Sequence, residues 1–220
     1  NSFAKASVFE KDRIIFTEQH ADFDRAMAEN LLVRFPGIRS CIIGSVRDLP
    51  DDIGEWFPAY LHLLIPGPYT KYPVQHRYRT FNTLGIDRIA AVVAASHLFP
   101  AKDVLVIEAG TCITYDLIDA GGTYQGGSIS PGIRLRFKAL HTFTDKLPLI
   151  QAIAEAPLTG DTTEASIQSG VINGVKAEVE GIMARYLDRY ENLTIILSGG
   201  DSHYFDKMLK NNIFAVPNIV

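Results

Sequence analysis

The order of apolar segments and glycine turns is nearly the same in the two halves of the chain, and this repeat restricts the fold more than any other feature. In each half, two strand-like segments joined by a turn precede a third strand, a helix and a further strand. Sequence identity between the halves is negligible, so the repeat lies in the order of elements alone. Two α/β lobes that face each other across a cleft are the architecture that such a repeat predicts.

Hydrophobic periodicity and turn residues give the expected elements of the first half. The predicted strands cover 2–10, 13–17, 40–46 and 62–65, and the predicted helices cover 21–35, 51–56 and 85–99. A proline-rich aromatic loop over 66–83 separates the last strand from the last helix. We assign residues 1–100 to an N-terminal lobe.

The second half restarts the same pattern after a proline. Strands are expected over 104–107, 111–118, 123–130, 194–197 and 213–216, a turn over 108–110, and helices after Pro131-Gly132 and over 165–190 and 201–209. We assign residues 101–220 to a C-terminal lobe.

Composition excludes several classes of protein. The chain has 220 residues, enough for one large domain or two small lobes with hydrophobic cores. Its formal net charge of −4 provides no basic field, so neither nucleic acid nor an acidic membrane surface is an expected partner. No apolar run approaches the ~20 residues that span a bilayer. Two cysteines in apolar segments indicate reduced thiols and a cytoplasmic protein, and they argue against a zinc site.

Glycine, hydroxyl and carboxylate residues concentrate at the ends of apolar strands. They do so in four segments, 1–2, 108–111, 126–132 and 198–201. Glycine at a strand end lets backbone N–H groups approach an anion, and a hydroxyl adds a donor. Each segment alone could be an ordinary turn. Together, at equivalent places in the two halves, they favour a polyphosphate cradle and therefore a phosphotransferase.

Specific motifs follow one another in a fixed order. They are Gly85-Ile86-Asp87-Arg88, the segment 108–116, the segment 126–132, Thr162-Thr163 and the segment 198–201. In this order they resemble the type III pantothenate kinases, which belong to the superfamily of acetate kinase, sugar kinases, Hsp70 and actin. The resemblance implies an α/β fold of two facing ribonuclease H-like lobes with a nucleotide cleft between them. It also implies phosphorylation of pantothenate by ATP, the first step of coenzyme A synthesis, in a cytoplasmic homodimer that uses Mg²⁺ and K⁺ or NH₄⁺.

The resemblance also assigns residues to pantothenate, with Asp87 as the catalytic base. These residues are Tyr78, Gly85, Ile86, Asp87, Arg88 and Thr163. An ionised aspartate can accept the hydroxyl proton late in the transfer, although Asp87 could instead stabilise a helix N-terminus. Arg88 could form a bidentate pair with the substrate carboxylate or an ion pair on the helix surface. Tyr78 could be a packing residue, and Thr163 could cap the helix ahead of Ala165.

The ATP phosphates are assigned by the resemblance to Asn1, Ser2, Lys5, Gly110 and Thr111. The family's first phosphate motif begins with an aspartate and a glycine, which would stand before Asn1. We therefore expect that the chain starts inside this motif, without its magnesium-linked aspartate, and that the C-terminal end is also incomplete. Asp201 lies near the nucleotide in the superfamily, but a helix N-cap is the favoured interpretation here.

Glu108 stands where most members of the family have an aspartate that holds the monovalent cation. Glutamate offers the same hard oxygen ligands on a side chain one methylene longer, so the dependence on potassium is open. The helix over 165–190 carries Gly170, Gly174 and Gly181, which suit either a dimer contact or a contact within the lobe. Two alternatives to the pantothenate kinase remain, a kinase of another small alcohol and a non-catalytic regulator like the Bvg accessory factor.

Overall fold

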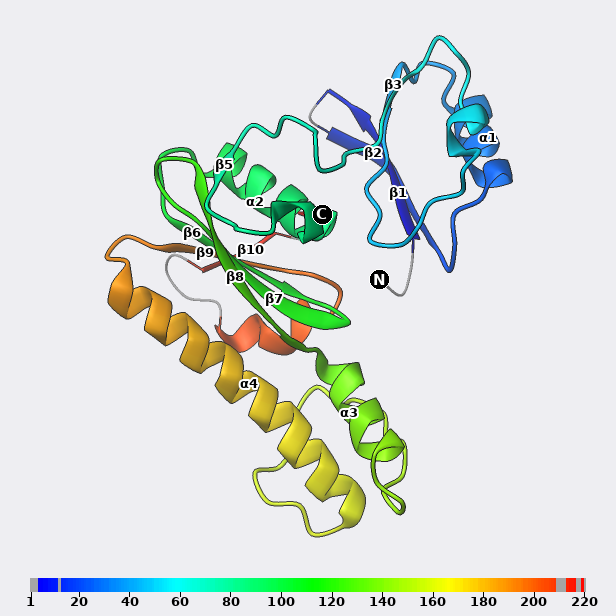
Figure 1. Ribbon diagram of the computed structural model, residues 1–220. Helices are drawn as coiled ribbons and strands as arrows, with labels where there is room; N and C mark the ends of the chain where they lie inside the picture. Colours follow the sequence, from blue (N-terminus) through cyan, green and yellow to red (C-terminus); the bar gives the residue numbers. More distant parts are fainter. Residues whose placement is uncertain (1–3, 12, 209–212, 217–218, 220) are drawn as a thin grey trace. The chain divides into compact units, whose positions relative to one another are not determined.

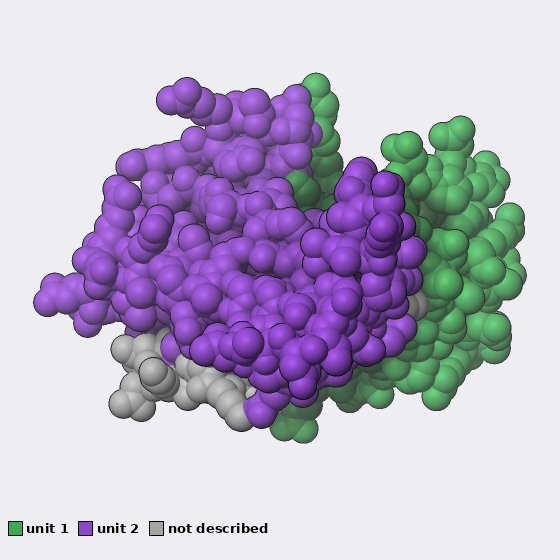
Figure 2. All heavy atoms as spheres, turned by 90° about the horizontal axis from the view of Figure 1, so that it is seen from below, with its two compact units in different colours: residues 1–70, 85–87 green, residues 71–84, 88–220 purple. Residues whose placement is uncertain are grey.

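The computed structural model describes residues 4–11, 13–208, 213–216 and 219 (Figure 1). Its contacts divide the chain into two compact units, which Figure 2 colours separately. The smaller unit holds residues 1–70 and 85–87, and the larger holds residues 71–84 and 88–220. No boundary between these units coincides with the predicted boundary at residue 100. The division into lobes of residues 1–100 and 101–220 stays a prediction.

The smaller unit consists of short elements around a small core. Its elements are β1 (Ala4–Glu10), β2 (Arg13–His20), α1 (Arg25–Arg34), β3 (Ser40–Ile42), η1 (Ile53–Trp56) and β4 (His62–Leu64). Strands β1 and β2 pair antiparallel, and β3 and β4 pair parallel. Helix α1 starts four residues later than predicted, because Asp24 caps it by accepting a hydrogen bond from Met27 N.

The larger unit is built on a six-stranded mixed sheet with the order β10-β9-β6-β7-β8-β5. Its strands are β5 (Gln75–His76), β6 (Val104–Ala109), β7 (Cys112–Ile118), β8 (Thr123–Pro131), β9 (Thr194–Ser198) and β10 (Ile213–Ala215). Strands β6, β7 and β8 form an antiparallel meander, while β6 pairs parallel with β9. Two loop residues of the expected 66–83 segment, Gln75 and His76, therefore add an edge strand.

One predicted turn is wrong. Glu108 and Ala109 belong to β6, where they pair with Thr114 and Ile113 of β7. Glu108 also pairs with Ser198 of β9. The turn is therefore at Gly110 and Thr111, one to two residues later than a charged residue after an apolar run suggested.

Helices cover both faces of the sheet in the larger unit (Figure 1). They are α2 (Ile86–Leu98), which starts in the smaller unit, α3 (Ile133–Thr142) and α4 (Thr163–Arg189), with the 3₁₀ segments η2 (Phe81–Thr83) and η3 (Ser202–Met208). The α4 side of the core joins Val171 and Val175 to Leu105 and Ile195. Because both faces of the central strands are buried, β6 and β9 read as continuous apolar runs. None of the helices in the described part of the chain is long and apolar enough to cross a membrane.

Candidate active site

Three of the four predicted phosphate segments lie together in the larger unit. We call this arrangement the glycine junction and define it as Gly110, Thr111, Gly132 and Gly199. Gly132 N donates a hydrogen bond to Thr111 O at 3.0 Å. The fourth segment, Asn1 and Ser2, lies outside the described residues.

The glycine junction exists because its strand ends carry no side chains. A Cβ on Gly132 would overlap the carbonyl oxygens of Gly110 and Thr111. Gly199 has a φ of +93°, which favours glycine, and a Cβ there would overlap the backbone of Ala109. The turn leaves Thr111 exposed at the surface of the unit. Its hydroxyl and the nearby backbone are the kinds of group that bind phosphate oxygens.

Asp201 is buried beside this junction. Its backbone N donates to Ala109 O at 2.9 Å, and its carboxylate accepts a hydrogen bond of 2.8 Å from Arg134 Nη2. Arg134 is an exposed residue of α3. Asp201 does stand directly before η3, where a cap would be, but its side chain forms an ion pair with α3 that the sequence pattern did not indicate.

Glu108 lies half-buried on β6, with its Oε2 atom buried. A buried carboxylate oxygen is the type of ligand that a hard cation prefers. In the part of the chain that the structure describes, however, no three histidine, cysteine, aspartate or glutamate side chains form a metal-binding group.

A second site in the larger unit is built from side chains. We call it the Arg88 cluster and define it as Tyr78, Arg88, Asp116 and Tyr124. Arg88 Nε donates to Asp116 Oδ1 at 3.0 Å, and Arg88 Nη2 donates to the same oxygen at 2.6 Å and to Tyr124 Oη at 2.9 Å. Tyr124 Oη in turn donates to Asp116 Oδ1 at 2.7 Å.

The ring of Tyr78 completes the Arg88 cluster. It stacks on Tyr124 with ring centroids 5.8 Å apart, and Arg88 Cζ lies 5.8 Å from its centroid. A Cβ on Gly126 would lie against the Tyr78 ring, at 3.6 Å. Two of the residues predicted to bind pantothenate, Tyr78 and Arg88, are therefore in contact with the same tyrosine.

The pKa values of the Arg88 cluster reflect a balance between burial and the charge of Asp116. Arg88 and Asp116 are 6% and 0% exposed. Burial alone would lower the pKa of Arg88, but the hydrogen bonds and the charge of Asp116 outweigh it and raise that pKa. Burial and the Asp116 carboxylate raise the pKa of Tyr124, which keeps its hydroxyl protonated. Of the two alternatives for Arg88, the structure contains an ion pair, but this pair is buried and its partner Asp116 is a strand residue.

Gly85 and Asp87 form a compact local unit at the start of α2. A Cβ on Gly85 would overlap Asp87 Oδ1, so the carboxylate folds back over the glycine backbone. Asp87 is half-buried in the first turn of α2, where the helix dipole favours a negative charge. The absence of a side chain at Gly85 therefore leaves room for this carboxylate.

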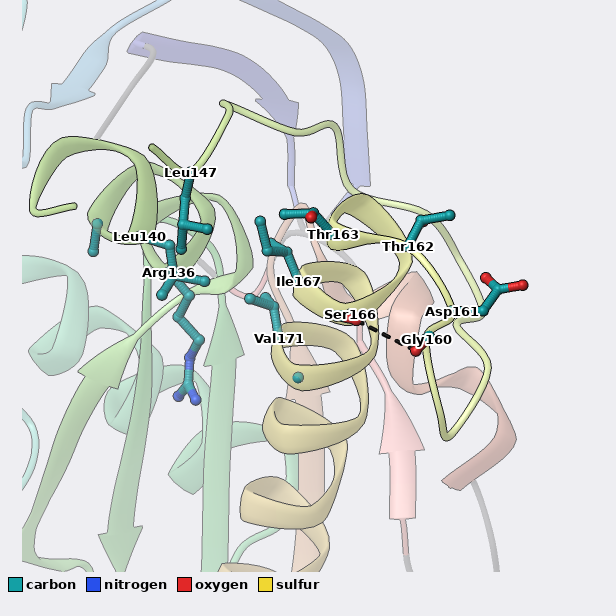
Figure 3. A pocket seen from close by; sticks show the side chains of 12 residues that line it. Arg136, Leu140, Leu147, Gly160, Asp161, Thr162, Thr163, Ser166, Ile167 and Val171 are labelled. Atoms are coloured by element: carbon teal, nitrogen blue, oxygen red, sulfur yellow. Dashed lines mark hydrogen bonds between the residues drawn. The ribbon is translucent and has the colours of Figure 1, made fainter. Parts of the chain in front are cut away.

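Helix α4 begins at a groove in the larger unit with a volume of about 1000 Å³ (Figure 3). Thr162 accepts a hydrogen bond from Ala165 N at 3.1 Å and is the helix cap. The suggestion that Thr163 caps the helix is therefore wrong. Thr163 is exposed and lines the groove, together with Arg136 of α3 and the apolar side chains of Leu140 and Ile167.

The glycines of α4 point away from the body of the larger unit. Gly170, Gly174 and Gly181 are exposed, and a Cβ on any of them would meet nothing within 4 Å. A contact within the lobe does not explain these glycines. Within the described part of the larger unit, nothing packs against this glycine face of α4.

Comparison with known proteins decides the family. The model of the type III pantothenate kinase family matches residues 1–185. The type III pantothenate kinase of Christiangramia forsetii is 44% identical, over 100% of this chain and 91% of the relative. The type III pantothenate kinase of Phocaeicola vulgatus is also 44% identical, over 98% of this chain and 89% of the relative. This chain belongs to the type III pantothenate kinase family.

A solved structure supports the fold. A protein described as a 2-dehydro-3-deoxygalactonokinase from Sinorhizobium meliloti aligns with a TM-score of 0.51 at 13% identity, covering 98% of this chain and 91% of that one. At this identity the likeness concerns the fold alone. It confirms the predicted mixed α/β fold.

Sequence reasoning missed several residues of the two sites. Asp116 was the last residue of a recognised motif, but no pattern marked it as the partner of Arg88. Tyr124 stood in a predicted strand without any signal. Glu178 stood in a predicted helix, α4, and no sequence pattern marked it either. It accepts hydrogen bonds from Tyr115 at 3.1 Å and Ser130 at 2.6 Å.

Proposed function

We propose that this chain transfers the γ-phosphoryl group of ATP to the primary hydroxyl of pantothenate, the first step of coenzyme A synthesis. Its family carries out this reaction. The observation that carries the proposal for this chain is the glycine junction, where Gly132 packs against the backbone of the Gly110–Thr111 turn and Gly199 packs against the backbone of Ala109. Such an arrangement offers backbone N–H groups and a hydroxyl to phosphate oxygens.

In this proposal Asp87 acts on the alcohol. It orients the hydroxyl and accepts its proton, while Asn1, Ser2, Lys5, Gly110 and Thr111 hold the phosphates of ATP. The transition state of phosphoryl transfer is loose, so positioning and charge neutralisation contribute more than the base. The folding of the Asp87 carboxylate over Gly85 supports a positioned rather than a freely rotating base.

Mg²⁺ and a monovalent cation belong to the proposal as family expectations. Bound cations would neutralise charge on the phosphates during transfer. Glu108 is the residue we propose for the monovalent cation, since its buried carboxylate oxygen is a hard ligand. Potassium, ammonium and sodium therefore need to be compared directly.

Pantothenate would be held by Tyr78, Gly85, Ile86, Arg88 and Thr163. The contact of Tyr78 and Arg88 in one cluster supports this assignment. The protein is proposed to be a cytoplasmic homodimer, and the open glycine face of α4 supports a contact with a second copy.

The test is an ADP-release assay of the full-length protein with a panel of small alcohols, each in potassium, ammonium and sodium buffers. We expect ADP release that depends on pantothenate and is fastest with that alcohol. Faster turnover of a different alcohol would make the protein another kinase of the superfamily. Tight binding of ATP or pantothenate without ADP release would contradict the enzymatic function.

A further inference from the structure

The ion pair of Arg134 and Asp201 adjoins the glycine junction through both of its members. Arg134, at the start of α3, follows Gly132 by two residues. Asp201 follows Gly199 by the same interval, and its backbone N donates to Ala109 O at 2.9 Å. Two residues span at most about 7 Å, so the backbone of each member stays near the junction. The pair therefore stands beside the groups that we propose for the phosphates of ATP.

The two members of the pair differ in burial. The side chain of Asp201 is 5% exposed, whereas that of Arg134 is 70% exposed. A buried carboxylate needs a counter-charge. Among the described residues Arg134 supplies it, through a hydrogen bond of 2.8 Å from Nη2 to Oδ1. The guanidinium is therefore fixed at one corner, while most of the side chain faces solvent.

An arginine held in this way is prepared to bind an anion. A guanidinium has five N–H donors, and the hydrogen bond to Asp201 uses one donor of Nη2. The exposed part of the fork has the geometry that forms charge-assisted hydrogen bonds with phosphate oxygens. Because Asp201 already restricts the side chain, binding orders it at a lower cost in rotamer entropy than an unrestrained surface arginine.

We propose that Arg134 is a ligand of the ATP phosphates, in addition to the residues that the family resemblance assigns to them. This inference rests on the proposed function, which places the phosphates at the glycine junction. It adds a positively charged side chain to a junction that is itself built from backbone groups and the Thr111 hydroxyl. The phosphates are the part of ATP that such a charge recognises.

A purely structural role for Arg134 makes a different prediction. If Arg134 only neutralised Asp201, its loss would weaken nucleotide binding through the uncompensated negative charge beside the phosphates. Removal of that charge by Asp201→Asn would then restore binding. If Arg134 binds phosphate itself, the double variant stays weak. The double variant therefore separates the two roles.

Lys138 provides a matched control on the same helix. It is exposed and follows Arg134 by four residues, so it lies on the same face of α3 about one turn further along. Arg134→Met and Lys138→Met each remove one exposed positive charge. In calorimetric titrations of the full-length protein with ADP and Mg²⁺, Arg134→Met should raise the Kd about tenfold, the effect of one lost hydrogen bond to a charged group. Lys138→Met should change the Kd less than about twofold, because salt screens attraction at a distance.

The double variant and the kinetics complete the test. In the Arg134→Met background, Asp201→Asn should leave the Kd for ADP about tenfold above wild type. The KM for ATP should rise with Arg134→Met, while the KM for pantothenate stays within about twofold. Recovery of the wild-type Kd in the double variant would overturn the proposal, and so would equal Kd values for Arg134→Met and Lys138→Met.

ADP binding keeps this inference separate from the proposed function. A wild-type protein that binds ADP but releases none from ATP and pantothenate would refute the proposed function, and the Kd values would still decide the role of Arg134. An active wild-type enzyme whose Arg134→Met variant binds ADP equally well refutes the inference alone. Absence of ADP binding by the wild-type protein overturns both.

Discussion

The glycine junction and the Arg88 cluster are two solutions to the same problem, the fixing of polar groups in the larger unit. At the glycine junction the polar groups belong to the backbone, and the absence of side chains at Gly132 and Gly199 brings them together. In the Arg88 cluster they belong to side chains, and a buried charge pair holds them. The structure of the glycine junction depends on residue size, and that of the Arg88 cluster depends on the balance of buried charges.

This difference predicts how each site fails. A small apolar addition should disturb the glycine junction, while an exchange of similar size that removes a charge should disturb the Arg88 cluster. The predictions below change one property at a time and descend in the size of the expected effect.

The largest effect on stability should come from the buried ion pair. Asp116→Ala leaves the Arg88 guanidinium buried without its counter-charge, and we expect a loss of about 3–5 kcal/mol in the free energy of unfolding. Urea denaturation followed by circular dichroism measures it. The exposed pair of Arg25 and Glu29 is the control, since solvent screens it and Glu29→Ala should cost far less stability than Asp116→Ala. A loss below about 1 kcal/mol for Asp116→Ala would show that the ion pair does not stabilise the Arg88 cluster.

The glycine junction should respond to a single methyl group. Gly199→Ala places a Cβ into the Ala109 backbone at a positive φ, and we expect a cost of about 2–4 kcal/mol together with a higher KM for ATP. Gly200→Ala is the matched control, because a Cβ there meets nothing within 4 Å. Thermal melts and the two KM values separate the variants. Equal behaviour of the neighbouring glycines would contradict the account of the junction.

The two threonines at the start of α4 should separate stability from substrate binding. Thr162→Ala removes the cap and should cost about 1 kcal/mol of stability. Thr163→Ala should leave stability unchanged and raise the KM for pantothenate. If the effects were exchanged, the assignment of cap and substrate residue would be reversed.

The smallest effect is expected at Glu178, a polar network that is only partly buried. Burial raises the pKa of Glu178, but hydrogen bonds from Arg136 and Ser130 outweigh it and lower that pKa. A carboxyl whose pKa is lowered by folding stabilises the native state above the unfolded pKa and ceases to do so as the pH falls through the folded value. Glu178→Gln should therefore reduce stability at neutral pH, and the difference from wild type should disappear in acid. A difference that grows towards acid pH would be inconsistent with this network.

The sequence predicted the elements of the larger unit better than its contacts. Strands β6 and β9 contain the unbroken apolar runs Val104–Ile107 and Ile195–Leu197 because both of their faces are buried, so the strand positions could be predicted to within two residues. Glu108 was misplaced in a turn, since its charge suggested a strand end although the strand continues beside β9. The segments of the glycine junction could be predicted because glycine residues at strand ends are visible in the sequence itself.

The Arg88 cluster could not be predicted in the same way. Arg88 lies 28 residues from Asp116 and 36 from Tyr124 along the chain, and their contact depends on how α2 packs on the sheet. No local pattern carries that information. Arginine, aspartate and tyrosine are also ordinary surface residues, so their types alone do not indicate burial.

The measurement that tests the central claim most directly is mass spectrometry of the products formed by the full-length protein from ATP and pantothenate. The account predicts 4′-phosphopantothenate and an equal amount of ADP. It also predicts that Asp87→Asn, with an unchanged melting temperature, forms the product about 10²–10⁴ times more slowly. Unmodified pantothenate after prolonged incubation, or an Asp87→Asn variant within a few-fold of wild type, would contradict it.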